Sequence, residues 1–430
     1  MKTLRLKTLI VCISFSFIFS NSIAQEKTSL MVDSIAKLVK KYYVSLEVGE
    51  KISTVLLDKN KAGAYAKILD PKKLANQLTA DLRSVNGDLH MYVQYRLKNK
   101  TKKGREVSNK VNRYGKWTNY GFQEIKILEG NIGYLKIKHF TQWKYFDAAK
   151  KVITSTMNSL KNTDALLIDV RDNGGGFESI VAYLISHFFD GESIHLSDYY
   201  YRYADERYGV HTTVDIPGPK LPKLPVYILV NKRTASAAES LAYMMKHLGR
   251  ATVIGETTAG AGNGAMAHRV NDEFTVTIAS EETINTVTKT SFEKVGVIPT
   301  IKVKSDDAFS KGYQLALESV KNRNDSIHPS NYEKLIALNT NKNIALSKEK
   351  LQKYVGTYKG AIAEIVISIK GEKLYATIVG KGSALKLIPK KDHVFVVENV
   401  GERIQFVFNK KNEAIKLIGV DSPMDLKRIK

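Results

Sequence analysis

The chain has 430 residues, a formal net charge of +23 from an excess of lysine and arginine, and a single cysteine, Cys12. This length predicts two or three domains with ample material for hydrophobic cores. Because Cys12 lies in the first two dozen residues, the rest of the chain has no thiol for disulfides, thiol catalysis or thiolate metal sites. The basic residues are scattered and lack interleaved aromatics, so we expect a generally basic surface and no nucleic-acid site.

Residues 1–24 have the pattern of a secretory signal peptide. A basic start, "MKTLRLK", precedes the apolar run "TLIVCISFSFIFS", and the small-residue segment "SIA" precedes Gln25. We therefore expect cleavage after Ala24 and export to the periplasm or the extracellular space. Val11 is larger than the small residue expected before a lipid-modified cysteine, which favours release. No later run is long and apolar enough to span a bilayer, so no integral membrane segment is expected after signal removal.

Residues 25–110 are predicted to form a helical N-terminal domain. Apolar residues recur three and four apart in "SIAKLVKKYY", "EKISTVLLDKNKAGAYAKI" and "PKKLANQLTADLRSV". The last helix ends at "NGDLH", and "MYVQYRL" after it is a candidate short strand.

Residues 111–325 change to short apolar strands that alternate with amphipathic helices. Strands are expected in "IGYLKIKHF", "ALLIDVRDN" and "VYILVN", and helices in "YFDAAKKVITSTMNSL", "FESIVAYLISHFF" and "AAESLAYMMKHL". This alternation predicts an α/β domain with a largely parallel, helix-covered sheet. Functional groups gather at the carboxyl ends of such strands, where "RDNGGG" and "TASAAE" fall.

Residues 331–430 are predicted to form a small antiparallel, barrel-like β domain. After one short helix come "AEIVISI", "KLYATIV", "ALKLIP", "HVFVVEN", "RIQFVFN" and "AIKLIGV", separated by turns such as "KGEK" and "NKKNE". We find no candidate nucleophile or metal-ligand cluster in this region.

Ser236 in "TASAAE" has two explanations. It lies where an apolar strand ends and a helical pattern begins, and Glu239 stands three residues later, which is the spacing of a capping box. The alternative is a catalytic nucleophile at a strand-to-helix turn. Local sequence favours the cap, because capping boxes are common, so the rest of the chain must decide between them.

The glycines 174–176 in "DVRDNGGG" predict either a tight turn or a loop whose backbone N–H groups approach a ligand closely. The chain has no phosphate-loop GK pair and no dinucleotide-binding glycine spacing there. We therefore expect no cofactor and no metal. An oxyanion hole between this loop and the start of the following Ser236 helix is the functional alternative, since a helix N-terminus adds positive partial charge.

Five motifs, in order and spacing, resemble the tail-specific, or C-terminal processing, serine peptidases. They are "GDLH", "ALLIDVRDNGGG", "TASAAE", "GRATVIGETTAGAGN" and "SFEKVGVIPTI". The sequence is most similar to the branch that contains the tricorn core and the modules of interphotoreceptor retinoid-binding protein, and the resemblance spans residues 29–321. It implies a Clp/crotonase-like β/α core between the helical N-terminal domain and the C-terminal β domain.

The resemblance also implies a Ser-His-Glu triad. One branch of the family places a lysine base where this chain has Ala261, which argues against a Ser-Lys dyad. The tricorn-like branch uses an upstream histidine and a later glutamate, which correspond to His90 in "GDLH" and Glu293 in "FEKVGVIP". Ser236 would attack the carbonyl, His90 would transfer the proton, and Glu293 would orient the imidazole.

The expected oxyanion donors are the backbone amides of Ala237 and of Gly174 or Gly175. The predicted function is that of an exported serine endopeptidase that hydrolyses peptides or unfolded protein chains through an acyl-enzyme. The main alternative is a non-catalytic carrier of apolar ligands on the retinoid-binding-protein-like fold. A crotonase-type acyl-CoA enzyme shares the core architecture, but it would not require the triad and would lack coenzyme A after export.

Overall fold

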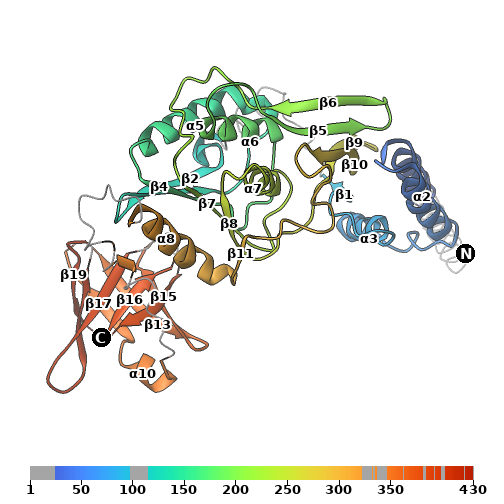
Figure 1. Ribbon diagram of the computed structural model, residues 1–430. Helices are drawn as coiled ribbons and strands as arrows, with labels where there is room; N and C mark the ends of the chain where they lie inside the picture. The colour runs from blue at the N-terminus through green and yellow to red at the C-terminus, as the bar shows by residue number, and fades with distance from the viewer. Residues whose placement is uncertain are drawn as a thin grey trace, which may run out of the picture.

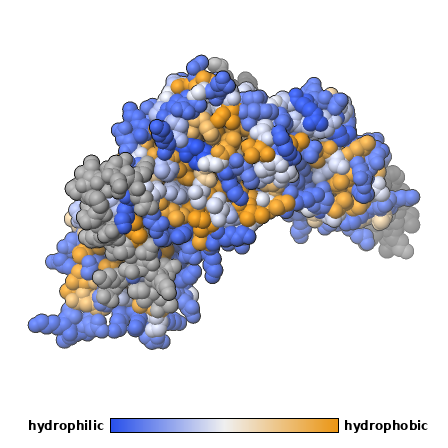
Figure 2. All heavy atoms as spheres, in the orientation of Figure 1, coloured by the Kyte–Doolittle hydropathy of each residue, from blue (hydrophilic) through white to orange (hydrophobic). Residues whose placement is uncertain are grey.

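The computed structural model describes residues 25–96, 115–321 and 346–429, with short gaps at 362, 381–383, 392, 399–401 and 421, and also 332, 335 and 336. The expected signal peptide and both expected domain boundaries lie outside these residues. Over the described ranges, every helix is too short or too polar to cross a membrane. Figure 2 shows a mostly hydrophilic outline with hydrophobic patches over the α/β core.

The N-terminal section is helical, as the periodicity predicts. Residues 25–42 form the first helix, followed by α2 (Leu46–Lys61) and α3 (Pro71–Arg83). Ser45 caps α2 by accepting a hydrogen bond from the Val48 N–H, and Asp70 caps α3, which has a proline at its first position. The apolar faces of these helices are buried against one another, and α3 leads directly to His90 and the strand that follows it.

The N-terminal helices do not have a separate core. Strand β1 (Tyr92–Tyr95) pairs antiparallel with β10 (Phe274–Asn285), with Val93 opposite Val276. Apolar side chains of the helices and of β10 form one buried cluster. The N-terminal section therefore completes a sheet that otherwise belongs to the core, and this packing fixes the position of the segment that carries His90.

The central sheet has the order β11-β8-β7-β4-β3-β2. Its strands are β2 (Phe122–Leu128), β3 (Ile132–Ile137), β4 (Ala165–Asp169), β7 (Val226–Val230), β8 (Thr252–Gly255) and β11 (Ile301–Lys302). All neighbours are parallel except the edge strand β2. Every residue of β4 and β7 is buried, as expected for strands covered on both faces.

Helices cover both faces of this sheet (Figure 1). The helices α5 (Phe146–Leu160), α6 (Glu178–Ile185, continued by a short 3-10 turn) and α7 (Ala237–His247) share a core with Leu166, Ile168 and Ile228. Helix α8 (Ser305–Lys321) packs with Leu167 and Leu229, whose side chains point to the opposite face. The predicted α/β core is confirmed, with each expected strand and helix in place.

A second, antiparallel sheet was not predicted. Its order is β1-β10-β5-β6, with β9 also paired to β10, and its further strands are β5 (His195–Tyr201), β6 (Glu206–His211) and β9 (Gly264–Arg269). The sequences of β6 and β9, "ERYGVH" and "GAMAHR", carry few large apolar side chains, and all of their residues are exposed or half-buried. Such strands show weak alternation, and cross-strand pairing rather than burial holds them in place.

The C-terminal domain is a closed barrel of eight antiparallel strands. They are β12 (Gly356–Lys359), β13 (Glu364–Lys370), β14 (Lys373–Ile378), β15 (Ala384–Lys391), β16 (Val394–Val397), β17 (Arg403–Phe408), β18 (Ala414–Gly419) and β19 (Asp425–Arg428), preceded by α10 (Lys348–Gln352). Aromatic side chains fill its interior, including Tyr358, Phe395 and Phe406. The barrel contacts the α/β core through ion pairs such as Lys386–Asp306, 2.9 Å.

Candidate active site

Two loops meet at the carboxyl ends of β4 and β7. The loop after β4 begins at Asp169, whose buried carboxylate accepts hydrogen bonds from Arg171 and from the Tyr134 hydroxyl. The loop after β7 is tied to it, because the Ala235 N–H donates to the Asn173 carbonyl at 2.9 Å. The structure therefore brings "RDNGGG" and "TASAAE" together at one edge of the sheet, as the sequence analysis predicted.

Ser236 occupies a strained position at the start of α7. Its φ and ψ are 55° and −128°, a region that non-glycine residues rarely adopt. The Glu239 carboxylate accepts a 2.9 Å hydrogen bond from the Ser236 N–H, which is one of the contacts of a capping box. The Ser236 hydroxyl takes part in this capping box but also faces a side chain from another part of the chain, so the cap alone does not account for its surroundings.

That side chain is His90. Its Nε2 lies 3.2 Å from the Ser236 Oγ, although the two residues are 146 positions apart. Burial lowers the pKa of the His90 imidazole, with Asp88 acting in the opposite direction. A neutral imidazole at hydrogen-bond distance from a hydroxyl is the arrangement that general-base catalysis requires.

Asp88 holds the His90 segment in place, a role that sequence reasoning did not assign. Its buried carboxylate accepts a 2.9 Å hydrogen bond from the His90 backbone N–H and another of 2.9 Å from the Tyr43 hydroxyl. The Asn263 side-chain amide donates to the same carboxylate at 3.4 Å. Asp88 lies inside the motif "GDLH", two residues before His90, and this position was the feature of the sequence that could have indicated its role.

Glu293 lies beside the loop that contains Gly262 and Asn263. Their backbone N–H groups donate to Glu293 Oε2 at 2.7 and 3.1 Å. Burial, with a further contribution from Asp88, raises the pKa of the Glu293 carboxyl to about 7. Within the described parts of the chain, Glu293 Oε1 and His90 Nδ1 are both buried without a hydrogen-bond partner.

The glycines 174–176 differ in what they contribute. The Gly175 N–H donates a 2.8 Å hydrogen bond to Asn173 Oδ1, so this expected oxyanion donor is already paired. Gly175 has φ +98°, and an added Cβ would lie 2.7 Å from the Ser236 Cβ, which shows how closely the loop approaches the serine. Gly176 and Ala237 line the cleft at Ser236, whereas Gly174 does not.

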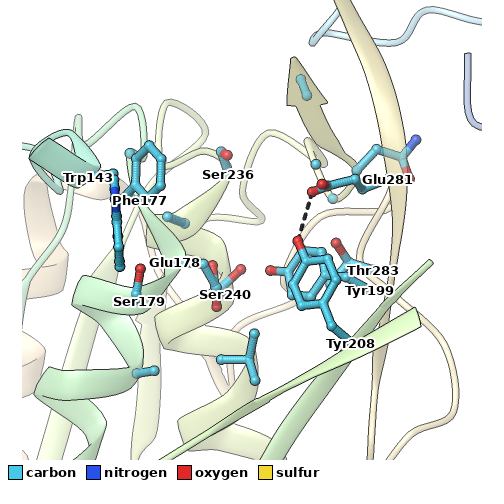
Figure 3. Close-up of a pocket in the computed structure, with 18 of the residues that line it drawn as sticks. Trp143, Phe177, Glu178, Ser179, Tyr199, Tyr208, Ser236, Ser240, Glu281 and Thr283 are labelled. Carbon is cyan, nitrogen blue, oxygen red and sulfur yellow. Dashed lines mark hydrogen bonds between the residues drawn. The ribbon is translucent and has the colours of Figure 1, made fainter. Parts of the chain in front are cut away.

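A cleft of about 660 Å³ opens at Ser236 (Figure 3). His90 and Ala261 contribute to its lining. Ala261 is buried and presents only a methyl group where a related branch has a lysine. Across the described ranges, no three His, Cys, Asp or Glu side chains are grouped as potential metal ligands.

Known proteins match most of the N-terminal and core regions. The family model "Peptidase family S41" matches residues 131–303, and "N-terminal domain of Peptidase_S41 in eukaryotic IRBP" matches residues 24–117. The carboxy-terminal processing protease CtpB of Bacillus subtilis is 29% identical over 50% of this chain and 46% of its own. The chloroplastic carboxyl-terminal-processing peptidase 2 of Arabidopsis thaliana is 33% identical over 39% of this chain and 31% of its own.

The chain thus spans less than half the length of these two relatives. Among solved structures, a lipoprotein from Streptococcus agalactiae matches with a TM-score of 0.49 and 16% identity, over 69% of this chain and 96% of that one. A helix-covered sheet that carries a serine on a strained strand-to-helix turn is an architecture found in serine hydrolases. With both family regions matched, the chain belongs to peptidase family S41.

Proposed function

We propose that the protein is an exported serine endopeptidase that cleaves peptides or unfolded protein chains with Ser236, His90 and Glu293. The observation that carries the proposal is the 3.2 Å contact between His90 Nε2 and Ser236 Oγ. These two residues, far apart in sequence, meet because β1 pairs with β10 and because the loops after β4 and β7 lie at one edge of the central sheet.

The proposed reaction uses this geometry. The Ser236 Oγ attacks the carbonyl carbon of the scissile bond while its proton passes to His90 Nε2. Collapse of the tetrahedral intermediate breaks the C–N bond, and His90 returns the proton to the leaving amine. Water then attacks the acyl-enzyme by the same route in reverse, with His90 as the base, and releases Ser236.

Glu293 is proposed to orient the imidazole. Its Oε1 and the Nδ1 of His90 are both buried and unpaired among the described residues, and each such orphan atom costs stability. A small movement that lets His90 Nδ1–H donate to Glu293 Oε1 would satisfy both atoms and fix the tautomer whose Nε2 accepts the serine proton.

We further propose that Ala237 and Gly176 supply the oxyanion donors. Both line the cleft at Ser236, and neither N–H donates a hydrogen bond to any group in the described ranges. The Ala237 N–H also lies at the N-terminus of α7, where the helix dipole favours negative charge. In studied proteases the loss of one such donor raises the barrier by about 3 kcal/mol.

The test is hydrolysis of an unfolded protein by the full chain, with the cut sites read by mass spectrometry. Ser236→Ala and His90→Ala should each lower the rate at least about a thousandfold, and Glu293→Gln should retain more activity than either. His247→Ala is the matched control, because His247 stands at the other end of α7. Normal cleavage by folded Ser236→Ala would refute the proposal.

Export is part of the same proposal and rests on residues 1–24. The N-terminus of the protein recovered from its producing cell should be Gln25, and sequencing of that terminus tests the expectation. The cleft does not favour the carrier of apolar ligands, because two glutamates face into it and burying their charge beside an apolar ligand is costly.

A further inference from the structure

The cleft at Ser236 has two chemically different walls (Figure 3). Trp143 and Phe177 form an aromatic wall, with ring centroids 6.2 Å apart. The opposite wall is polar and comes from the second sheet, where the rings of Tyr199 and Tyr208 stack at 5.2 Å. A substrate side chain with an apolar stem and a polar end group could therefore contact both walls of the cleft, each with the matching part.

Glu178 lies at the bottom of this cleft, close to the nucleophile. It is the first residue of α6, and its carboxyl group faces Ser240 and Tyr199. Its Oε1 is buried and has no hydrogen-bond partner among the described residues. Ser240 lies one helical turn beyond Ser236 on α7, so the carboxylate is about one turn, roughly 5 Å, deeper than the reacting hydroxyl.

A second carboxylate faces the same space. Glu281 on β10 accepts a 3.1 Å hydrogen bond from the Tyr208 hydroxyl, and it projects into the cleft from the side opposite Phe177 (Figure 3). The described residues that line the cleft include no lysine or arginine, although the chain has 66 lysines and arginines against 43 acidic residues. The cleft is thus a local acidic region in a basic protein, and its carboxylates have no cationic partner there.

We propose that this cleft selects a lysine or arginine side chain in the substrate residue whose carbonyl carbon Ser236 attacks. The inference rests on the proposed peptidase function and names its substrate class. Lysine carries its ammonium on a flexible four-carbon stem, which is long enough to reach about one helical turn below Ser236, where Glu178 lies. Its methylene stem packs against the aromatic wall, and its ammonium reaches the unpaired Glu178 oxygen, with Glu281 adding a second negative charge.

The charge state of the cleft sets the assay conditions. Burial raises the pKa of the Glu178 carboxyl to about 7 and also raises the pKa of Glu281. Assays at pH 8 keep Glu178 mostly ionised, and a bound cation favours the charged form further. The substrates are peptides that are identical except at the residue before the cleaved bond, which is lysine, norleucine or glutamate.

Norleucine has the length of the lysine stem without its charge, so the lysine-to-norleucine ratio of kcat/KM isolates the ammonium. We expect a ratio of about 10 to 100, the value of one buried charge-assisted hydrogen bond. Glu178→Gln should reduce this ratio at least about fivefold, and Glu281→Gln should reduce it less. Glu282→Gln is the matched control, because Glu282 is the exposed neighbour on the other face of β10.

A binding measurement separates this inference from the proposed function. Ser236→Ala protein should bind the lysine peptide more tightly than the norleucine peptide, and Glu178→Gln in the same background should remove the difference. If no peptide is cleaved but this difference in binding is found, the peptidase proposal fails and the acidic subsite stands. If norleucine equals or exceeds lysine in both cleavage and binding, the inference is overturned even where Ser236-dependent cleavage is observed.

Discussion

Replacement of Glu239 by glutamine should loosen the whole turn that carries Ser236. The Glu239 side chain is fully buried, and its two oxygens accept hydrogen bonds from the N–H groups of Ser236, Gly260 and Ala261 at 2.7–2.9 Å and from the Thr258 hydroxyl. Each oxygen serves two donors. In Glu239→Gln the NH₂ group replaces one oxygen. If it replaces Oε1, the Thr258 hydroxyl can rotate to accept from it and only the Gly260 N–H faces another donor; if it replaces Oε2, the N–H groups of Ser236 and Ala261 both do.

The size of the effect follows from these contacts. In the better orientation the buried Gly260 N–H loses its acceptor, which costs about 1–3 kcal/mol, and the remaining hydrogen bonds weaken because the acceptor is no longer charged. Burial raises the pKa of Glu239, and a neutral amide avoids this desolvation penalty, which offsets part of the loss. We expect a net destabilisation of about 1–3 kcal/mol, a sizeable share of the stability of a typical domain.

Urea unfolding followed by circular dichroism measures this change, and peptide hydrolysis by the folded variant should show kcat falling more than KM rises, because the nucleophile is displaced. Glu256→Gln is the control, since the Glu256 carboxylate takes no hydrogen bond from a described residue. A Glu239→Gln protein within about 0.5 kcal/mol of wild type, with full kcat, would show that this hydrogen-bond network does not hold the serine in place.

Three further outcomes are expected. As the pH rises, kcat/KM should increase and level off above about 7. The reason is that the pKa of the Glu293 carboxyl is raised to about 7, so the carboxyl loses its charge as the pH falls through that value. In Glu293→Gln the fall in kcat/KM at acid pH should move to lower pH, since burial lowers the pKa of the remaining group, His90. Gly176→Ala should abolish activity and destabilise the fold, because its Cβ would lie 1.6 Å from a backbone carbonyl oxygen. Gly174→Ala, where an added Cβ has open space, should retain activity. Thermal melts and hydrolysis rates of the two variants test this difference. A chain truncated after Ile336, which keeps Tyr332 and Leu335 in the buried cluster around α8, should remain folded and cleave short peptides, and a folded but inert core would show that the barrel belongs to the catalytic unit.

The parts of the fold that could be predicted from sequence are those in which burial dictates the pattern. Strands β4 and β7 are continuous apolar runs because both of their faces are covered, and the helices between them show apolar residues at helical spacing. The strands β12 and β19, which close the barrel, were missed. Their sequences, "GTYK" and "DLKR", carry one buried residue each, so neighbouring strands rather than their own side chains determine them.

The site, too, has residues that the sequence indicates and residues that only tertiary packing brings in. Ser236, His90 and Glu293 were proposed because motif order and family resemblance single them out, and their catalytic roles remain proposals. The cleft could not be foreseen, since Glu178 and Glu281 come from α6 and β10, and only the unpredicted antiparallel sheet turns Glu281 towards Glu178. Contacts between elements that carry weak local signals are set by tertiary packing, which a single sequence does not display.

The pairing of β1 with β10 has a consequence for when hydrolysis can begin. His90 is held by a segment near the N-terminus, whereas Ser236 and Glu293 follow in the later core, so a chain emerging N-terminus first carries the proposed base long before the proposed nucleophile. Even a complete core would hold an unactivated hydroxyl until the early helices dock on β10. Loosening of that one strand pairing would separate His90 from Ser236 without unfolding the central sheet, so docking of residues 25–96 would be the step that completes the proposed site.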